Sequence, residues 1–78
     1  MTRDELNGWI EQIKTLDQEH EQANYAGFLQ KKVKLGAVKS KYKLVQSSIK
    51  LHFDNMENDV KEDAIAVLQY LENTLNNM

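Results

Sequence analysis

Cysteine and proline are absent from this chain of 78 residues, and glycine occurs only three times. Without cysteine, neither a disulfide nor a cysteine-based zinc site can reinforce the small core that a chain of this length encloses. Proline and glycine are the residues that most often interrupt helices, so their scarcity favours long helical segments. We therefore expect one compact helical domain that covers residues 1–78.

Acidic residues are missing from the middle of the chain. No Asp or Glu lies between Glu21 and Asp54. The seven positive charges of this segment are Lys31, Lys32, Lys34, Lys39, Lys41, Lys43 and Lys50. The flanks are the reverse, with six acidic residues against two basic ones in 1–21 and six against one in 54–78. This order is typical either of a phosphate-binding surface or of a bundle whose acidic outer segments neutralise a basic central one.

Long apolar runs are also lacking. No stretch approaches the roughly 20 apolar residues that span a bilayer, and the first residues are charged rather than apolar. Hydrophobic residues nevertheless make up 41% of the chain, which is too many for a disordered tail. We expect a cytoplasmic protein that does not bind membranes.

Both ends of the chain show the periodicity of amphipathic helices. Thr2 and Glu5 have the spacing of a capping box. The apolar face that follows consists of Leu6, Trp9, Ile10, Ile13 and Leu16, continued by Asp17, His20 and Ala23. Near the other end, Asp59 can cap a second stripe, formed by Val60, Ala64, Val67, Leu68, Leu71 and Leu75. These patterns predict one helix to about residue 22 and another from about residue 59.

The middle segment fits two interpretations, of which the first is helical. A helix over about 37–56 has one narrow apolar arc, made of Val38, Tyr42, Val45, Ile49, His52, Phe53 and Met56. Its opposite side carries a second stripe, Ala37, Leu44 and Leu51. A short helix within 25–33 would precede it and end at Gly36. Two apolar faces suit a helix sandwiched between the outer ones, or one that uses its second face in a dimer.

The second interpretation is a sheet, because apolar and basic residues alternate in 32–35, 41–44 and 49–53. It predicts an α+β fold of helix, three-stranded sheet and helix, with five lysines on one open face: Lys32, Lys34, Lys41, Lys43 and Lys50. No Asn-Gly, Asp-Gly or Pro fixes the hairpin turns that this sheet needs. We therefore favour an all-α fold, a small three- or four-helix bundle, over the helix–sheet–helix alternative.

Motifs for chemistry are incomplete. His20-Glu21 begins like the zinc-protease helix motif, but Asn24 stands where the second histidine is required. Asp17 and His20, one turn apart on the apolar arc, indicate either an acid–base pair or polar residues at the edge of the core. We expect no catalytic, cofactor-binding or metal-binding residue, and no enzyme.

Two functional hypotheses remain. The first is a small helical module that binds another protein or itself, most readily as a homodimer, through Trp9, Ala37, Leu44 and Leu51. Its size and composition resemble those of compact regulators and inhibitors from bacteria or their phages. The alternative is a sequence-tolerant nucleic-acid-binding module that uses Lys32, Lys34, Lys41, Lys43 and Lys50, since lysine attracts phosphates without reading bases.

Overall fold

The computed structural model describes residues 3–78, and this part of the chain folds into three α-helices. Helix α1 spans Arg3–Asn24, α2 spans Phe28–His52 and α3 spans Asn58–Asn76. A short 3₁₀ helix, Phe53–Asn55, joins α2 to α3. The described residues contain no strand, so the helix–sheet–helix alternative is wrong and the all-α prediction is confirmed.

Helix α2 runs without interruption through Gly36, where the sequence predicted a break. A glycine inside a helix costs only about 1 kcal/mol relative to alanine. Burial of Val38, Tyr42 and Ile49 farther along the same helix outweighs that cost. The Ser40 hydroxyl donates a hydrogen bond back to the Gly36 carbonyl at 3.1 Å, as serine does inside continuous helices. The predicted short helix before Gly36 is therefore part of α2.

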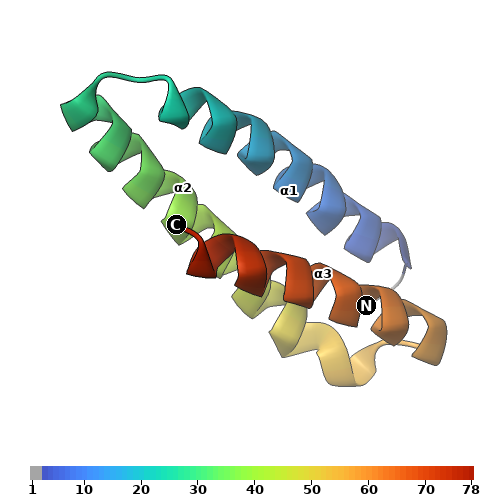
Figure 1. Ribbon diagram of the computed structural model, residues 1–78. Coiled ribbons are helices and arrows are strands. Elements are labelled where there is room, and N and C mark those ends of the chain that lie inside the picture. Colours follow the sequence, from blue (N-terminus) through green and yellow to red (C-terminus); the bar gives the residue numbers. More distant parts are fainter. Residues whose placement is uncertain (1–2) are drawn as a thin grey trace.

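Helices α1 and α2 form an antiparallel hairpin, and α3 returns along it (Figure 1). Residues 25–27 make the turn of this hairpin, where the Tyr25 amide donates to the Gln22 carbonyl at 3.1 Å. The end of α3 lies beside the middle of α2, because Leu75 lines a surface hollow together with Lys39 and Lys43. The α1–α2 turn therefore projects beyond the end of α3 (Figure 1).

The core lies on one side of α2 and joins all three helices. Its buried residues are Leu6, Ile13 and Leu16 of α1, Val38, Tyr42, Val45 and Ile49 of α2, Met56 of the second turn, and Val60, Ala64 and Leu71 of α3. These positions belong to the apolar stripes that the helical periodicity predicts. His52 is an exception, because it is exposed where α2 ends and the chain turns away from the core.

Helices α1 and α3 both pack against the side of α2 that carries Tyr42 and Ile49. The second stripe of α2 is left in water: Leu44 is 68% exposed and Leu51 is 76% exposed. Ala37, the third residue of this stripe, is exposed as well. Helix α2 is therefore not sandwiched between the outer helices, which removes one of the two arrangements that its two apolar faces suggested.

Arg3 ties the start of α1 to the start of α3. Its guanidinium donates hydrogen bonds to Asp63 and, at 3.1 Å, to Asp59. The hydrogen bond from Arg3 lowers the pKa of Asp59. Asp59 was predicted to cap the last helix, but α3 begins one residue before it, so this carboxylate is used in the ion pair instead. The predicted cap at Thr2 lies outside the described residues.

The contrast between the two faces of α2 gives a test of the core. We expect Leu71→Ala to lower the free energy of unfolding by about 2–5 kcal/mol, because Leu71 is fully buried. Ile13→Ala and Ile49→Ala should have costs in the same range. Leu44→Ala removes the same atoms from an exposed site and should cost less than about 1 kcal/mol. Urea unfolding of the variants measures this, and equal costs at Leu44 and Leu71 would show that the core is misplaced.

Candidate protein-binding surface

The large apolar side chains that remain in water are concentrated on α2 and on the turn before it. Val33 is 74% exposed on α2, like Leu44 and Leu51. Tyr25 is exposed in the turn, and Phe28 and Leu29 are exposed at the start of α2. On α3 only Ile65 and Tyr70 are comparable, and each is about half exposed. Single exposed apolar residues are common on protein surfaces, but a contiguous row of them marks an interaction site.

Exposed apolar residues of α2, together with two serines, form a row in which successive members are alternately four and three residues apart. We name it the α2 seam, and it consists of Val33, Ala37, Ser40, Leu44, Ser47 and Leu51. Positions at this spacing lie along one side of a helix, as in the contact line of helix pairs. Small residues separate the large ones along the seam, so its surface has both projections and dips. Its length, about five helical turns, is enough for a second helix to lie along it.

A groove between α1 and α2 adjoins the seam. It has a volume of about 400 Å³, and its apolar lining consists of Trp9 and Leu16 from α1 and Leu44 and Val45 from α2. We call it the α1/α2 groove. The predicted partner-binding residues Trp9 and Leu44 thus meet in one groove, although they lie on different helices. Such a groove, apolar with a few polar edges, is typical of sites that receive a partner side chain or helix.

The groove continues toward the α1–α2 turn as a second hollow of about 260 Å³, which Ala37 helps to line. Glu19 and Lys41 line both hollows, and Lys41 Nζ lies 3.3 Å from Glu19 Oε2 across them. The structure therefore places three of the four predicted partner-binding residues along this groove. Leu51, the fourth, lies farther along the α2 seam.

The predicted phosphate-binding lysines do not share one face. Lys34 and Lys41 line the α1/α2 side of α2, whereas Lys43 and Lys50, with Lys39, line a hollow on the α3 side. The lysines would lie on one face only in a strand, where alternate residues point the same way. The segment is helical instead, so they are distributed around α2. Within residues 3–78, the one ion pair between a lysine of α2 and a carboxylate joins Lys41 and Glu19. Acidic flanks therefore neutralise little of the basic helix.

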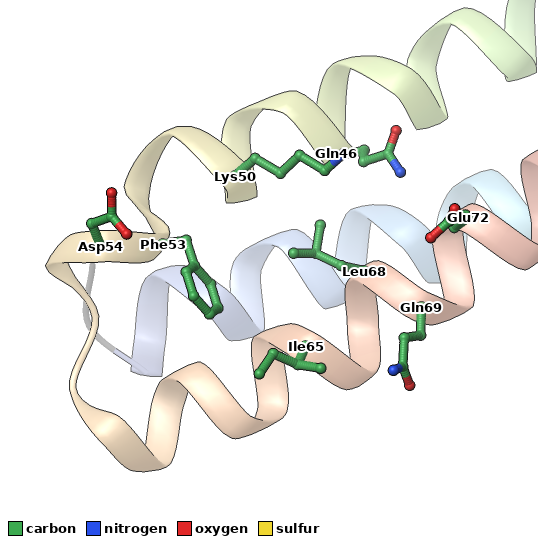
Figure 2. Close-up of a pocket in the computed structure, with 8 residues that line it drawn as sticks. All are labelled: Gln46, Lys50, Phe53, Asp54, Ile65, Leu68, Gln69 and Glu72. Carbon is green, nitrogen blue, oxygen red and sulfur yellow. The ribbon is translucent and has the colours of Figure 1, made fainter.

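A shallower hollow lies between α2 and α3, at the end of the core near the second turn (Figure 2). Its volume is about 270 Å³. Figure 2 shows the Phe53 ring beside the Ile65 and Leu68 side chains, with charged residues around them. Lys61 Nζ lies 5.7 Å from the centre of the Phe53 ring. This hollow brings together apolar side chains that pack the end of the core, with Lys50, Asp54 and Glu72 at its edge.

A polar cluster in the middle of the molecule joins all three helices. The Tyr42 hydroxyl of α2 donates a hydrogen bond to Asp17 Oδ1 of α1 at 2.5 Å. The Tyr70 hydroxyl of α3 donates to Asp17 Oδ2 at 2.7 Å. Burial and the hydrogen bond to Asp17 raise the pKa of Tyr42 far above its ordinary value. The hydrogen bond to Asp17 and partial burial also raise the pKa of Tyr70.

Asp17 is therefore a structural acceptor, and the sequence-based idea of an acid–base pair with His20 does not match its contacts. Both carboxylate oxygens of Asp17 accept from tyrosines. The His20 ring instead lies edge-on to the Tyr42 ring, with centroids 6.1 Å apart. Sequence reasoning noticed Asp17 on an apolar arc but not its partners. Tyr70 is 53 residues away, so no local pattern links them.

No group of three metal-binding side chains gathers in the part of the chain that the structure describes. None of the described helices is both long enough and apolar enough to cross a membrane. No family model, curated protein or solved structure matches this chain. The functional interpretation therefore rests on the surface geometry described above.

The tyrosine cluster predicts alkaline sensitivity. A tyrosine in the unfolded chain loses its proton near pH 10, whereas the raised pKa of Tyr42 keeps its proton in the folded chain. The unfolded state then binds fewer protons, so this contribution to stability is complete below about pH 10 and is lost as the pH rises beyond it. We expect the urea midpoint of Tyr42→Phe to fall less steeply between about pH 9.5 and pH 11 than that of the parent chain.

At neutral pH the same substitution should cost about 1.5–3 kcal/mol, because it removes a hydrogen bond to a charged acceptor. Tyr25→Phe is the matched control, since Tyr25 is 84% exposed and its hydroxyl has no hydrogen-bond partner among the described residues. It should keep both the stability and the alkaline slope of the parent. Identical slopes in the parent, Tyr42→Phe and Tyr25→Phe would contradict the role of this cluster.

Proposed function

We propose that this chain is a small three-helix bundle that acts as a protein–protein interaction module and carries no catalytic role. Its binding surface consists of the α2 seam and the adjoining α1/α2 groove. The observation that carries this proposal is the exposure of Leu44 and Leu51 on a helix whose other side is buried from Val38 to Ile49. An apolar row of this kind is costly to leave in water, and a partner that covers it removes that cost.

The energetics of the surface support binding. Complete burial of a leucine or valine side chain contributes about 1.5–3 kcal/mol, and the seam offers Val33, Leu44 and Leu51, each at least two thirds exposed. Trp9 lines the groove, and tryptophan is a frequent anchor of protein interfaces. Helix-in-groove recognition uses apolar residues at the spacing that the seam provides.

Two hydroxyl groups on this surface are compatible with burial. The Ser40 hydroxyl donates to the Gly36 carbonyl, and the Ser48 hydroxyl, in the groove, donates to the Leu44 carbonyl at 2.9 Å. A hydroxyl that already has a partner within its own helix loses little when water is removed. The seam and the groove therefore accept an apolar partner surface without leaving these groups unpaired.

The proposed partner is another protein or a second copy of the chain, and the proposed role is regulatory or inhibitory in the cytoplasm. A helical surface of this size acts by occupying a surface of its partner, which controls what else that partner binds. A homodimer would bury the α2 seam of both copies in one contact, but it would also bring together the lysines that flank the two seams.

The proposal is tested with Leu44→Asp, which places a charge in the seam and the groove. Sedimentation velocity of the chain at high micromolar concentration, and capture by the immobilised chain from an extract of its source cells, should reveal a saturable complex. We expect Leu44→Asp to abolish that complex and leave the thermal unfolding transition in place. Gln18→Asp, which adds the same charge at an exposed site of α1, should retain both. Unfolding of the Leu44→Asp chain, or a complex that survives in it, would overturn the proposal.

A second candidate function, nucleic-acid binding, is favoured by one observation. Lys39, Lys43 and Lys50 line one hollow together with Glu72, and none of the three lysines forms an ion pair among residues 3–78. If phosphates bind here, affinity for DNA or RNA must fall steeply with salt and show little sequence preference. The double variant Lys43→Glu and Lys50→Glu, which reverses two charges of this hollow, would then abolish retardation of nucleic acid in a gel. The protein-binding proposal expects no retardation by the parent chain even at low salt, because acidic α1 and α3 repel the same backbone.

A further inference from the structure

We infer that the partner covering the α2 seam is an amphipathic helix of another protein, with an apolar stripe flanked by acidic side chains. This inference rests on the proposed function and specifies its partner. It follows from the charges beside the seam, from the other surfaces of this chain and from the shape of the seam itself.

Lysines flank the seam on both sides. In a helix of 3.6 residues per turn, Lys34 and Lys41 lie along the edge that faces the α1/α2 groove. Lys43 and Lys50 lie along the opposite edge, on the α3 side. In paired helices the residues at these flanking positions face those of the partner and determine which partner is accepted. Carboxylates at the flanking positions of a partner helix would complement both edges.

These lysines are available to such a partner. Lys34, Lys43 and Lys50 are exposed and have no ion pair in the described part of the chain. Lys41 is paired with Glu19, but both side chains remain partly exposed, at 57% and 41%. Helix α2 itself contains no acidic residue. The positive charge beside the seam is therefore not neutralised by the helix that carries it.

A second copy does not supply the complementary surface. If α2 paired with α2 of another copy, the flanking lysines would face each other in either the parallel or the antiparallel arrangement, and like charges at these positions are repulsive. Helix α1 is acidic but exposes no large apolar side chain within Arg3–Asn24. Helix α3 exposes Ile65 and Tyr70, which lie five residues apart and so on different faces. None of the three helices combines an apolar stripe with acidic edges.

The shape of the seam favours a helix over a nucleic acid or a lipid surface. A phosphate backbone would pair with the lysines but leave Leu44 and Leu51 in water. Ala37 and Ser40 form a dip between Val33 and Leu44, all four of which are exposed. Dips between large residues receive the projecting side chains of a second helix. A flat apolar layer would fill them poorly.

The test uses a synthetic peptide of about three heptads, with leucine at the two apolar positions and glutamate at the flanking ones. Glutamates at the flanking positions of two peptide copies repel each other, so the free peptide does not pair with itself. An isolated amphipathic peptide forms little helix without packing of its apolar face, so helix formation on binding is visible by circular dichroism. Trp9 is the single tryptophan of the chain and lines the groove beside Leu44. A peptide without tryptophan therefore allows Trp9 fluorescence to report binding.

We expect saturable one-to-one binding of the acidic peptide, weakened about tenfold or more when salt rises from about 50 mM to about 500 mM. A peptide with lysine at the flanking positions should not bind. The double variant Lys43→Glu and Lys50→Glu should lose at least about tenfold in affinity for the acidic peptide and gain affinity for the basic one. Lys14→Glu with Lys61→Glu changes the net charge equally on α1 and α3, and should bind the acidic peptide nearly as the parent does.

Several results would overturn this inference. One is absence of binding to the acidic peptide, or equal binding of both peptides. Another is self-association of the chain that Leu44→Asp abolishes, which identifies a second copy as the occupant. A shift of Trp9 fluorescence with phosphatidylserine vesicles but not with the peptide identifies a membrane, and salt-sensitive DNA binding that ignores Leu44→Asp identifies a nucleic acid. If extract capture depends on Leu44 while the acidic peptide fails, the proposed function stands and only the nature of the partner is wrong.

Discussion

The packing of α1 and α3 on the same side of α2 is the constraint on which the rest of this structure depends. Tyr42 and Ile49 are fully buried where the three helices meet, and the hydrogen bonds of Tyr42 and Tyr70 to Asp17 join α1 to both other helices at that level. Once both shorter helices lie on this side, no element of the described chain remains to cover the other side of the longest helix. The exposed seam and the open groove are consequences of this arrangement. A fourth helix, supplied by a partner, would occupy the uncovered side.

The placement of α1 and α3 also explains why the charges of the three helices do not cancel. Two acidic helices would neutralise a basic helix between them if they surrounded it. Because they lie to one side, only Lys41 and Glu19 form an ion pair between α2 and an acidic neighbour among residues 3–78. Most lysines of α2 instead face water, where exposed charges affect the rate and specificity of an association more than its strength.

The sequence predicted the features that depend on periodicity and missed those that depend on distant contacts. Helical spacing identified the buried stripes and the second face of α2, including Leu44 and Leu51. Alternation in short segments fits a strand as well as a two-faced helix, so spacing left both interpretations open, and within the helical one the predicted break at Gly36 was wrong. Burial of Val38 and Tyr42 against other helices decided the outcome. Trp9 and Leu44 were separate candidates, and their common groove depends on the register of α1 against α2. That register is set by packing and is not visible in either segment alone.

The uncovered beginning of α2 has a consequence for the motions of the chain. No residue between Phe28 and Ala37 is buried, so these first turns are held by backbone hydrogen bonds with little tertiary support. Segments of this kind open at a small fraction of the free energy of global unfolding, and their amide protons exchange with solvent faster than those near a packed core. A ligand that contacts Val33 binds the helical form of this segment, so any fraction of molecules in which these turns are open lowers its apparent affinity. Substitutions that stabilise the first turns of α2 would therefore strengthen binding there without touching the ligand.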